Sequence, residues 1–287
     1  MPVSNLNDVL RKAMNQDYAV GAFNIHNLEF AKAVMQAAEE LESPVILGIA
    51  PVSIDYAGLD ELAAVARVCA ERSNVPTVIH LDHGRDIEAV KKSISLGFSS
   101  VMYDGSKYPM EENIKRTREV VQVAHDSGVP VEGEIGIVGG YEELSGGTVD
   151  MDQLEKLYTV AEDAIRFVKE TGVDALAVAV GTVHCMPIQK AQIDFKRLQE
   201  IHQAVDIPLV FHGCTGLKNE DYQKASELGV KKFNIGTRLM MEFQAKLYRE
   251  LQNAEHRAVL RCLKEATEAV YRAVKDRMLI LNCAGKV

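Results

Sequence analysis

The sequence predicts an α/β fold, a (β/α)8 TIM barrel with an added helix at each end, and three observations lead to it. Short apolar runs rich in β-branched residues alternate with amphipathic helical stretches along all 287 residues. Several helices end in a glycine followed by an apolar residue, as at Gly97, Gly128, Gly172 and Gly229, and glycine readily adopts the left-handed conformation that stops a helix. Eight such units without a low-complexity linker favour a single barrel domain over residues 1–287.

An N-terminal helix is expected over Ser4–Gln16, with Ser4 as its candidate N-cap. Strands are expected at Ala19–Phe23, Val45–Ile49, Val75–Ile79, Ser99–Tyr103, Val129–Ile135, Ala175–Val180, Pro208–Phe211 and Lys232–Ile235. Helices are expected at Leu28–Leu41, Gly58–Glu71, Asp86–Leu96, Glu111–Ser127, Leu157–Thr171, Phe195–Val205, Asn219–Leu228, Leu239–Gln252 and Glu255–Met278. The alternative, an open doubly wound sheet, would need a glycine-rich phosphate loop after its first strand. Phe23-Asn24-Ile25-His26 is not such a loop.

The composition excludes several classes of protein. Lys and Arg number 32 against 41 Asp and Glu, so the net charge is −9 and no basic stripe indicates a nucleic-acid partner. No apolar run reaches the roughly 18 residues that span a bilayer, and the first residues lack the features of a signal peptide. Five cysteines without CxxC spacing are typical of free thiols in a reducing compartment. We therefore expect a cytoplasmic protein without nucleic-acid or membrane partners.

Titratable residues gather where the predicted strands end, which is where barrels of this class carry their active sites. The third strand is followed by His80-Leu81-Asp82-His83-Gly84, with two imidazoles and a carboxylate within four positions. Later strands contribute Asp104, Glu134, His184 and His212. For His80 alone, a polar residue that closes a strand is an equally good interpretation. Asp82 and His83 together indicate chemistry, because the later strands end in similar clusters.

Three of these histidines, His83, His184 and His212, are candidates to converge on one metal ion. Three neutral imidazoles with an open fourth position form a catalytic zinc site that polarises a carbonyl or activates water. Nitrogen ligands favour zinc or cobalt over magnesium. The alternative, judged from spacing alone, is a cleft lined by unrelated polar residues.

The loops after the seventh and eighth strands are candidates to hold a phosphate group, as these loops commonly do in barrels. Gly213, Cys214, Thr215 and Gly216 offer small residues and backbone N–H groups. Asn234-Ile235-Gly236-Thr237 precedes a predicted helix, whose N–H groups favour an anion. An ordinary strand-to-helix turn would explain the second segment nearly as well. A metal beside a phosphate pocket indicates a phosphorylated carbonyl substrate.

A glycine-rich segment follows the fifth predicted strand, with four glycines within residues 139–148. It is too long for a tight turn and is typical of a flap that closes over bound substrate. Glu142 and Glu143 would move with it. Solvated surface carboxylates are the alternative interpretation of these two residues.

Taken together, these motifs resemble the class II, zinc-dependent ketose-bisphosphate aldolases, and most of all the branch that acts on fructose and tagatose 1,6-bisphosphate. The resemblance extends from Ala22 to Val287. Its most specific motifs are His80-Leu81-Asp82-His83, Glu132-Gly133-Glu134-Ile135-Gly136 and Asn234-Ile235-Gly236-Thr237, in this order. The family implies a barrel that forms a homodimer or homotetramer and works in carbohydrate metabolism.

The resemblance also implies a role for each residue. His83, His184 and His212 match the zinc ligands, Asp82 the acid/base at the C4 hydroxyl, and Glu142 the flap carboxylate that deprotonates dihydroxyacetone phosphate. Asp104 and Glu134 match positions near a second or displaced metal, either a monovalent cation or a second divalent ion. The substrate and its phosphate would contact Asn24, Cys185, Gly213, Cys214, Thr215, Asn234, Ile235, Gly236, Thr237 and Arg257.

Four departures bear on the substrate. Cys185 replaces the usual glycine after the histidine of the sixth strand, and Cys214-Thr215 replaces a Gly-Ser or Ala-Ser pair. Ala50 stands where a serine or threonine touches substrate in relatives. Arg257 matches an arginine that reaches the neighbouring subunit's distal phosphate, although Glu255-His256 replaces the usual Asp-Pro before it.

Our hypothesis is a metal-dependent aldolase that reversibly cleaves a ketose 1-phosphate or 1,6-bisphosphate to dihydroxyacetone phosphate and an aldehyde. No lysine Schiff base is needed, since a divalent cation stabilises the charge that follows proton removal. One alternative is an aldolase for another phosphorylated ketose, such as a deoxy, sulfo or methylthio sugar. The other is a non-catalytic sugar-phosphate-binding partner subunit, which the bulkier Cys185 and Cys214 would favour.

Overall fold

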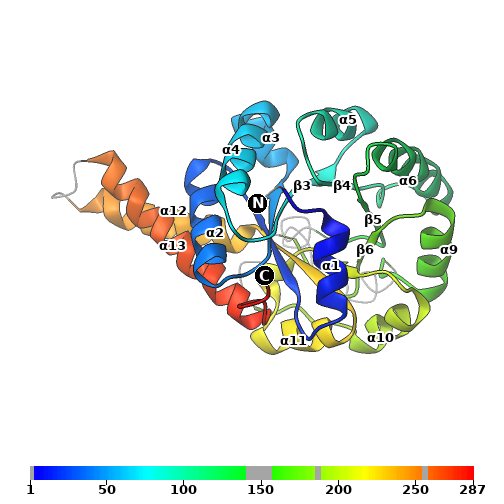
Figure 1. Ribbon diagram of the computed structural model, residues 1–287. Helices are drawn as coiled ribbons and strands as arrows, with labels where there is room; N and C mark the ends of the chain where they lie inside the picture. The colour runs from blue at the N-terminus through cyan, green and yellow to red at the C-terminus, as the bar shows by residue number, and fades with distance from the viewer. Residues whose placement is uncertain (1–2, 140–156, 185–188, 254–257) are drawn as a thin grey trace.

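Eight parallel strands close into a barrel in chain order, with β8 pairing back onto β1 (Figure 1). The computed structural model describes residues 3–139, 157–184, 189–253 and 258–287. Its strands are β1 (Val20–Asn24), β2 (Val45–Ile49), β3 (Thr77–Gly84), β4 (Ser100–Tyr103), β5 (Val131–Ile135), β6 (Ala175–Val178), β7 (Leu209–Phe211) and β8 (Val230–Ile235). The predicted (β/α)8 TIM barrel with added helices is confirmed.

The described helices lie outside the strands, most of them in a ring around the barrel and α1 across one of its ends (Figure 1). They are α1 (Leu6–Met14), α2 (Leu28–Glu40), α3 (Pro51–Ala57), α4 (Leu59–Arg72), α5 (Ile87–Ser95), α6 (Met110–His125), α9 (Ala161–Thr171), α10 (Phe195–Ala204), α11 (Asn219–Glu227), α12 (Thr237–Gln252) and α13 (Val259–Ile280), with a short 3-10 helix, η1 (Cys214–Gly216). α1 packs against β1 and β8 where these strands begin. The helices therefore cover the outer face of a sheet that is buried on both sides.

Local sequence explains where several helices stop. Gly97, Gly128, Gly172 and Gly229 adopt φ of +88°, +69°, +74° and +87°, so each provides the left-handed conformation expected after a helix. The chain then turns directly into the next strand. The repeated unit of helix, glycine and buried strand is therefore confirmed.

Some predicted boundaries were wrong. α1 is capped by Asn5, whose side chain accepts a hydrogen bond from Asn7 N, while Ser4 N donates to Thr77 O at 2.8 Å. The helix α3 was not expected; Pro51 at its first turn has the backbone angle that a helix requires. Residues 157–160 are not helical, because Thr159 ties this segment to the barrel through Ile135 O and Ala179 N.

The third strand is longer than predicted, and this difference bears directly on the titratable residues. β3 runs to Gly84, so His80, Asp82 and His83 lie within a strand and do not follow one. Its pairing with β4 shifts between Leu81 and Gly84, which marks a β-bulge. A bulge redirects the side chains of the strand that carries it, and this one lies at the end of the barrel where the titratable residues gather.

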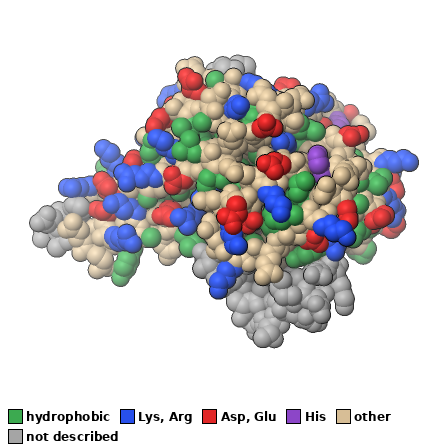
Figure 2. All heavy atoms as spheres, turned by 90° about the horizontal axis from the view of Figure 1, so that it is seen from below, with side chains coloured by type: hydrophobic (Ala, Val, Ile, Leu, Met, Phe, Trp, Pro, Cys, Tyr) green, Lys and Arg blue, Asp and Glu red, His purple; other side chains and the backbone are tan. Residues whose placement is uncertain are grey.

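α12 and α13 form a hairpin that projects beyond the barrel wall (Figure 1). α13 packs against α2, which anchors the hairpin to the barrel. Its outer part exposes large apolar side chains, including Leu260 at 76% and Tyr248 at 65%. Basic and acidic side chains are interspersed over the face drawn in Figure 2. Among the described residues, no helix has the length and apolar character needed to cross a membrane.

Candidate metal and active site

A cleft of about 150 Å³ opens at the carboxyl ends of the strands. Its lining comes from β1, β3 and β8, from the segments that follow β1, β2, β6 and β7, and from the helices α3 and α12. The lining residues are Asn24, His26, Ala50, Val52, Asp82, His83, His184, His212, Gly213, Cys214, Thr215, Asn234, Gly236, Thr237 and Met240. Most of the described residues that the sequence indicated therefore meet in one place.

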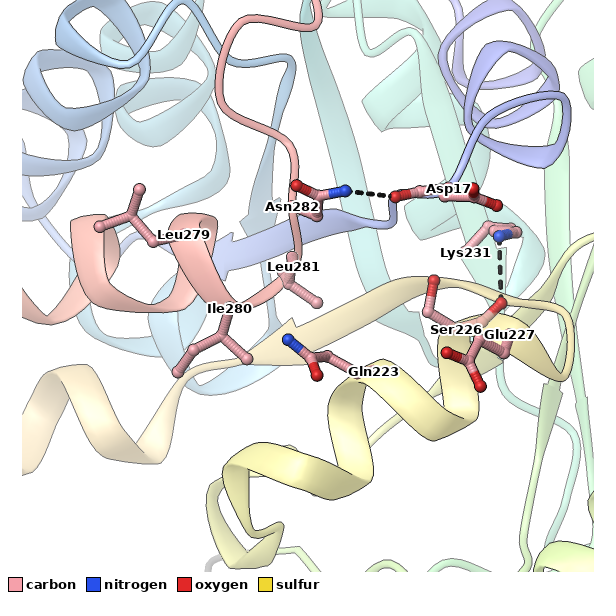
Figure 3. Close-up of a pocket in the computed structure, with 9 residues that line it drawn as sticks. All are labelled: Asp17, Gln223, Ser226, Glu227, Lys231, Leu279, Ile280, Leu281 and Asn282. Carbon is pink, nitrogen blue, oxygen red and sulfur yellow. Dashed lines mark hydrogen bonds between the residues drawn. The ribbon is translucent and has the colours of Figure 1, made fainter.

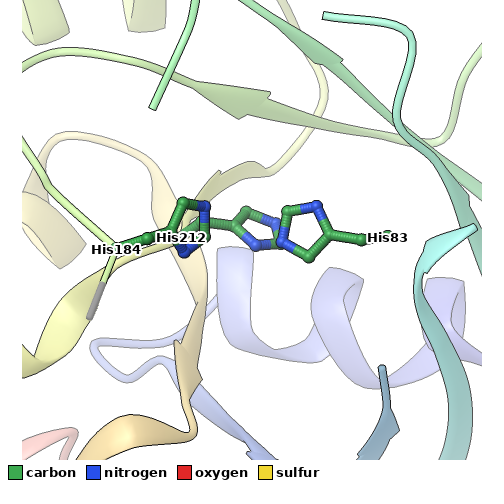
Figure 4. Close-up of side chains that lie close together, drawn as sticks. All are labelled: His83, His184 and His212. Carbon is green, nitrogen blue, oxygen red and sulfur yellow. The ribbon is translucent and has the colours of Figure 1, made fainter. Parts of the chain in front are cut away.

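Three imidazole rings converge in this cleft (Figure 4). The ring centroids of His83 and His212 lie 4.5 Å apart, those of His83 and His184 5.2 Å, and those of His184 and His212 6.0 Å. One nitrogen of each ring lies within 4.8 Å of the others. The three rings therefore offer three nitrogen ligands to a single ion.

The backbone directs two of these rings. His83 has a φ of +49°, a conformation that side chains rarely adopt, and such strain concentrates at functional sites. The next residue, Gly84, has no room for a side chain because the carbonyl oxygen of Met102 lies against it. Gly213 has a φ of +67°, and a Cβ there would come within 2.6 Å of the Val183 backbone. The absence of that Cβ lets the segment after β7 approach the segment that carries His184.

Hydrogen bonds fix how His212 presents its nitrogens. Its Nε2 lies 2.8 Å from Glu132 Oε1, whereas its buried Nδ1 has no partner among the described residues. His83 similarly has Nδ1 at 3.0 Å from Asp104 Oδ2. Metal-binding histidines usually donate their second ring N–H to a carboxylate in this way. The donor set therefore fits zinc, with His212 Nδ1 and one nitrogen each of His83 and His184 as ligands.

Several carboxylates at this end of the barrel favour a positive charge nearby. Burial alone would lower the pKa of His83, but Asp82, Asp104 and Glu134 raise it to about 10. Burial and the nearby Asp104 raise the pKa of Glu134 to about 8. His83, Asp104 and Glu134 also form a second group whose ligand atoms lie within 4.8 Å of one another. A cation is therefore favoured on either side of the His83 ring.

The side-chain amides of Asn24 and Asn234 donate hydrogen bonds to Asp82. Asn24 Nδ2 donates to Asp82 Oδ2 at 2.6 Å, and Asn234 Nδ2 donates to Asp82 Oδ1 at 2.9 Å. Burial alone would raise the pKa of Asp82, but His83, His212 and Lys232 hold it below its usual range. Gly236 leaves room for this arrangement, because a Cβ there would lie 2.6 Å from Asn24 Oδ1. Asp82 is thus a buried carboxylate that stays ionised and is held in one orientation.

His80 lies deeper in the barrel, where it is fully buried, and its Nδ1 lies 2.8 Å from Ser100 Oγ. Burial, more than any neighbouring charge, lowers the pKa of His80 to about 3. Its Nε2 faces Glu132 Oε2 at 3.7 Å. His80 therefore supports the site from below and does not line the cleft.

The residues expected at the phosphate end fall into two groups. Gly213, Thr215, Gly236 and Thr237 line the cleft, and Thr215 Oγ1 accepts a hydrogen bond from Arg238 N at 3.1 Å. Cys214 contributes to the lining but directs its thiol to Phe211 O at 3.1 Å. Ile235 is fully buried and is not a lining residue. Glu142, Cys185 and Arg257 lie outside the described residues.

Sequence reasoning missed several residues in and beneath the cleft, among them His26 and Lys232. His26, which follows the first strand, lines the cleft with Nδ1 at 2.7 Å from Ser53 Oγ, and burial lowers its pKa to about 4. Lys232 is fully buried and pairs with Glu132 Oε2 at 2.8 Å. A signal for Lys232 existed, because it precedes Asn234 by two positions and so points to the same face of the strand.

A larger hollow of about 490 Å³ lies at the opposite end of the barrel, beside Lys231 near the start of β8 (Figure 3). Asp17, Lys231 and residues 279–282 are among its lining residues. Lys231 Nζ donates to Ser226 O at 3.0 Å and Asn282 Nδ2 donates to Asp17 O at 2.6 Å. Backbone carbonyls thus satisfy both groups, and size alone does not make this hollow a site.

Comparison with known proteins agrees with this geometry. Residues 4–286 match the family model described as fructose-bisphosphate aldolase class-II. The solved structure of the YdjI aldolase from Escherichia coli K12 superimposes with a TM-score of 0.85 at 30% identity, covering 99% of each chain. A candidate fructose-1,6-bisphosphate aldolase from Coccidioides immitis gives 0.87 at 34% identity, covering 99% of this chain and 98% of that one. A fructose-bisphosphate aldolase from Campylobacter jejuni, 24% identical, gives 0.83 over 100% and 97% and supports the fold.

Proposed function

Because the chain belongs to the class II fructose-bisphosphate aldolase family, we propose that it cleaves a ketose 1-phosphate or 1,6-bisphosphate reversibly, with zinc, to dihydroxyacetone phosphate and an aldehyde. It is a lyase of the aldolase type. The observation that supports the substrate class and the metal is the convergence of three imidazoles beside a buried carboxylate, Asp82, in one cleft. A carbonyl electrophile and a proton acceptor are the two groups that this cleavage needs.

Zinc would be held by His83, His184 and His212, and it would supply an electrophile that stabilises negative charge developing beside the ketone. Asp104 and Glu134 stand around His83 and would hold a second cation or an alternative position of the first. Glu132 and Asp104 would fix the rings of His212 and His83 through their second nitrogens.

Asp82 would act as the base in the cleavage direction. It takes the proton of the C4 hydroxyl, the C3–C4 bond breaks, and its electron pair stays with C3 while C4 becomes the aldehyde carbon. Asn24 and Asn234 keep both carboxylate oxygens of Asp82 in place through hydrogen bonds of 2.6 and 2.9 Å. In the reverse direction, the flap residue Glu142 would remove the C3 proton of dihydroxyacetone phosphate.

The phosphate group would lie against Gly213, Thr215 and residues 234–237, at the N-terminus of α12, where the helix dipole favours an anion. Cys185 and Arg257 would complete the substrate contacts. The apolar side chains exposed on the α12–α13 hairpin support a homo-oligomer, a dimer or tetramer. We infer that the reaction belongs to cytoplasmic carbohydrate metabolism and that each subunit is a single barrel domain.

The direct test is exchange of the C3 proton of dihydroxyacetone phosphate with solvent deuterium, followed by nuclear magnetic resonance with zinc and with chelator. We expect exchange with zinc and its loss with chelator. Cleavage of a panel of ketose 1-phosphates and 1,6-bisphosphates then identifies the sugar, including deoxy, sulfo and methylthio sugars. A zinc-loaded protein that exchanges no proton would contradict the proposal. Of the two cysteines that would favour a non-catalytic subunit, Cys214 turns its thiol toward Phe211 O, and Cys185 lies outside the described residues.

A further inference from the structure

Lys232 is the most deeply buried cation in the barrel interior that the reaction described above does not use. Its side chain has no exposed surface, and it rises from β8 on the same face as Asn234. Its Nζ lies 2.8 Å from Glu132 Oε2 and donates to Asn234 Oδ1 at 2.6 Å. A buried ammonium is costly unless it is paired and hydrogen-bonded, and here two acceptors face it.

The contact between Lys232 Nζ and Asn234 Oδ1 decides which way the Asn234 amide points. An amide carries an acceptor oxygen and a donor NH₂ group, so an ammonium on one side selects the oxygen. The NH₂ group then faces Asp82 and donates to Oδ1 at 2.9 Å. The flipped amide would place its oxygen against the Asp82 carboxylate and its NH₂ group against the ammonium, which are two repulsive contacts. Lys232 therefore keeps Asn234 as a donor to Asp82.

The contact between Lys232 Nζ and Glu132 Oε2 decides which carboxylate oxygen of Glu132 accepts from His212. Glu132 is fully buried, and it accepts from His212 Nε2 through Oε1 while Oε2 faces Lys232. Without a cation, an ionised carboxylate in this position would be uncompensated. With Oε2 beside the Lys232 ammonium, Oε1 remains the acceptor for His212 Nε2, and this contact leaves the Nδ1 of His212 free for the metal.

We propose that Lys232 is a positioning residue that sets both halves of the site, orienting Asp82 through Asn234 and the metal ligand His212 through Glu132. This inference rests on the proposed function. Lys232 touches neither the cleft nor the substrate, since it is not among the lining residues and its Nζ is enclosed. It also forms no Schiff base, because its enclosed Nζ is out of reach of the substrate. Its effect should therefore fall on kcat and on metal affinity, and not on KM.

The chain offers a matched control. Lys231 precedes Lys232 in β8 and is also buried, at 8% exposure, but it points to the opposite side and donates to the backbone carbonyls of Ser226 and Tyr18. Methionine fills the volume of a lysine stem without its charge. We compare Lys232→Met with Lys231→Met in the full chain, measuring kcat, KM, zinc affinity by chelator competition, and the unfolding temperature of the metal-free protein.

For Lys232→Met we expect kcat to fall on the order of 100-fold, the effect of a misplaced catalytic group, with KM within about twofold. Zinc affinity should fall about 10- to 100-fold, as for loss of an outer-shell partner. Lys231→Met should match the wild type in kcat and zinc affinity. Unchanged kcat and unchanged zinc affinity in Lys232→Met would overturn the proposal.

A double variant separates positioning from mere charge balance. Glu132→Gln with Lys232→Met removes both buried charges but keeps an amide oxygen for His212 Nε2. We expect its unfolding temperature and zinc affinity to recover toward the wild type, while kcat stays low because Asn234 still lacks its anchor. Recovery of kcat as well would overturn the role assigned through Asn234. If the wild type itself lacked aldolase activity, the proposed function would fail, while zinc affinity would still test the connection from Lys232 to His212.

Discussion

The two ends of the barrel are both hollowed, and the larger hollow is the one without chemistry. At the amino end, a hollow of about 490 Å³ is bordered by Lys231 and Asp17. Backbone carbonyls there accept hydrogen bonds from Lys231 and Asn282. At the carboxyl end, a cleft of about 150 Å³ holds three imidazoles. There His212 Nδ1, Glu134 Oε2 and His26 Nε2 are buried without a hydrogen-bond partner among the described residues.

The difference teaches that unsatisfied buried polar atoms locate this site better than volume does. A buried polar atom without a hydrogen bond costs stability, so a cluster of them indicates a missing ligand. Tyr18 carries one unpaired hydroxyl near the amino end, but it has no metal-binding group beside it. Lys231 and Lys232 show the same contrast within one strand, since backbone carbonyls hold the first and functional side chains hold the second.

The largest effect should come from Asp82. Asp82→Ala removes the proposed base, and we expect cleavage to fall about 10²- to 10⁴-fold, while zinc is still bound through the three histidines. Asp17→Ala is the matched change at the amino end, and it should leave kcat unchanged because Asn282 bonds to the backbone oxygen of Asp17. Steady-state cleavage assays decide the matter. Equal losses in the two variants would abolish the distinction between the two ends.

The next largest effect concerns the metal. His184→Ala removes one of three converging nitrogens, and we expect zinc affinity to fall by more than the roughly 100-fold cost of an outer-shell change. His125→Ala is the control, since His125 is exposed and pairs with Asp174 at 2.7 Å. Competition with a chromogenic chelator measures both. A His184 variant that binds zinc as the wild type does would exclude the three-histidine site.

A smaller difference should separate two thiols. Burial raises the pKa of Cys214, whose thiol donates to Phe211 O, and its side chain is almost fully buried. Cys69 is only half-buried. We expect iodoacetamide to modify Cys69 in the native protein and Cys214 only after unfolding, as mass spectrometry of digests would show. Rapid native labelling of Cys214 would show that its thiol is accessible in the folded protein and would contradict this prediction.

The smallest effect tests whether every charge at the carboxyl end serves chemistry. Asp194 caps α10 by accepting from Arg197 N at 3.0 Å, and Asp194→Ala should cost about 1 kcal/mol of unfolding free energy at pH 7 without changing kcat. Burial alone would raise the pKa of Asp194, but the Arg197 hydrogen bonds lower it. A carboxyl group whose pKa is lower in the folded than in the unfolded protein stabilises the fold above the unfolded pKa of about 3.9. This stabilisation is lost as the pH falls through the folded pKa. Urea unfolding at pH 7 and pH 3 should therefore show a smaller difference at pH 3.

Much of the fold could be predicted because its signals are local. Alternating strand and helix patterns, closed by glycines such as Gly172 and Gly229, specified the barrel. The ends of strands were harder: β3 was predicted to stop at Ile79, yet it continues to Gly84 through pairing with β2 and β4. Hydrogen bonds from neighbouring strands decide such ends, and no local pattern encodes them.

The sequence by itself determined which residue types stand at the mouth of the barrel, including His83, His184, His212 and Asp82. It could do so because polar residues that come at or after short apolar runs are visible in the sequence, and the carboxyl ends of all the strands open at the same edge of a parallel barrel. Only the tertiary structure decided that Lys232 lies between Glu132 and Asn234. A lysine in isolation is expected at the surface. Its burial depends on the closure and register of the barrel, which bring β5 and β8 within reach of one ammonium group.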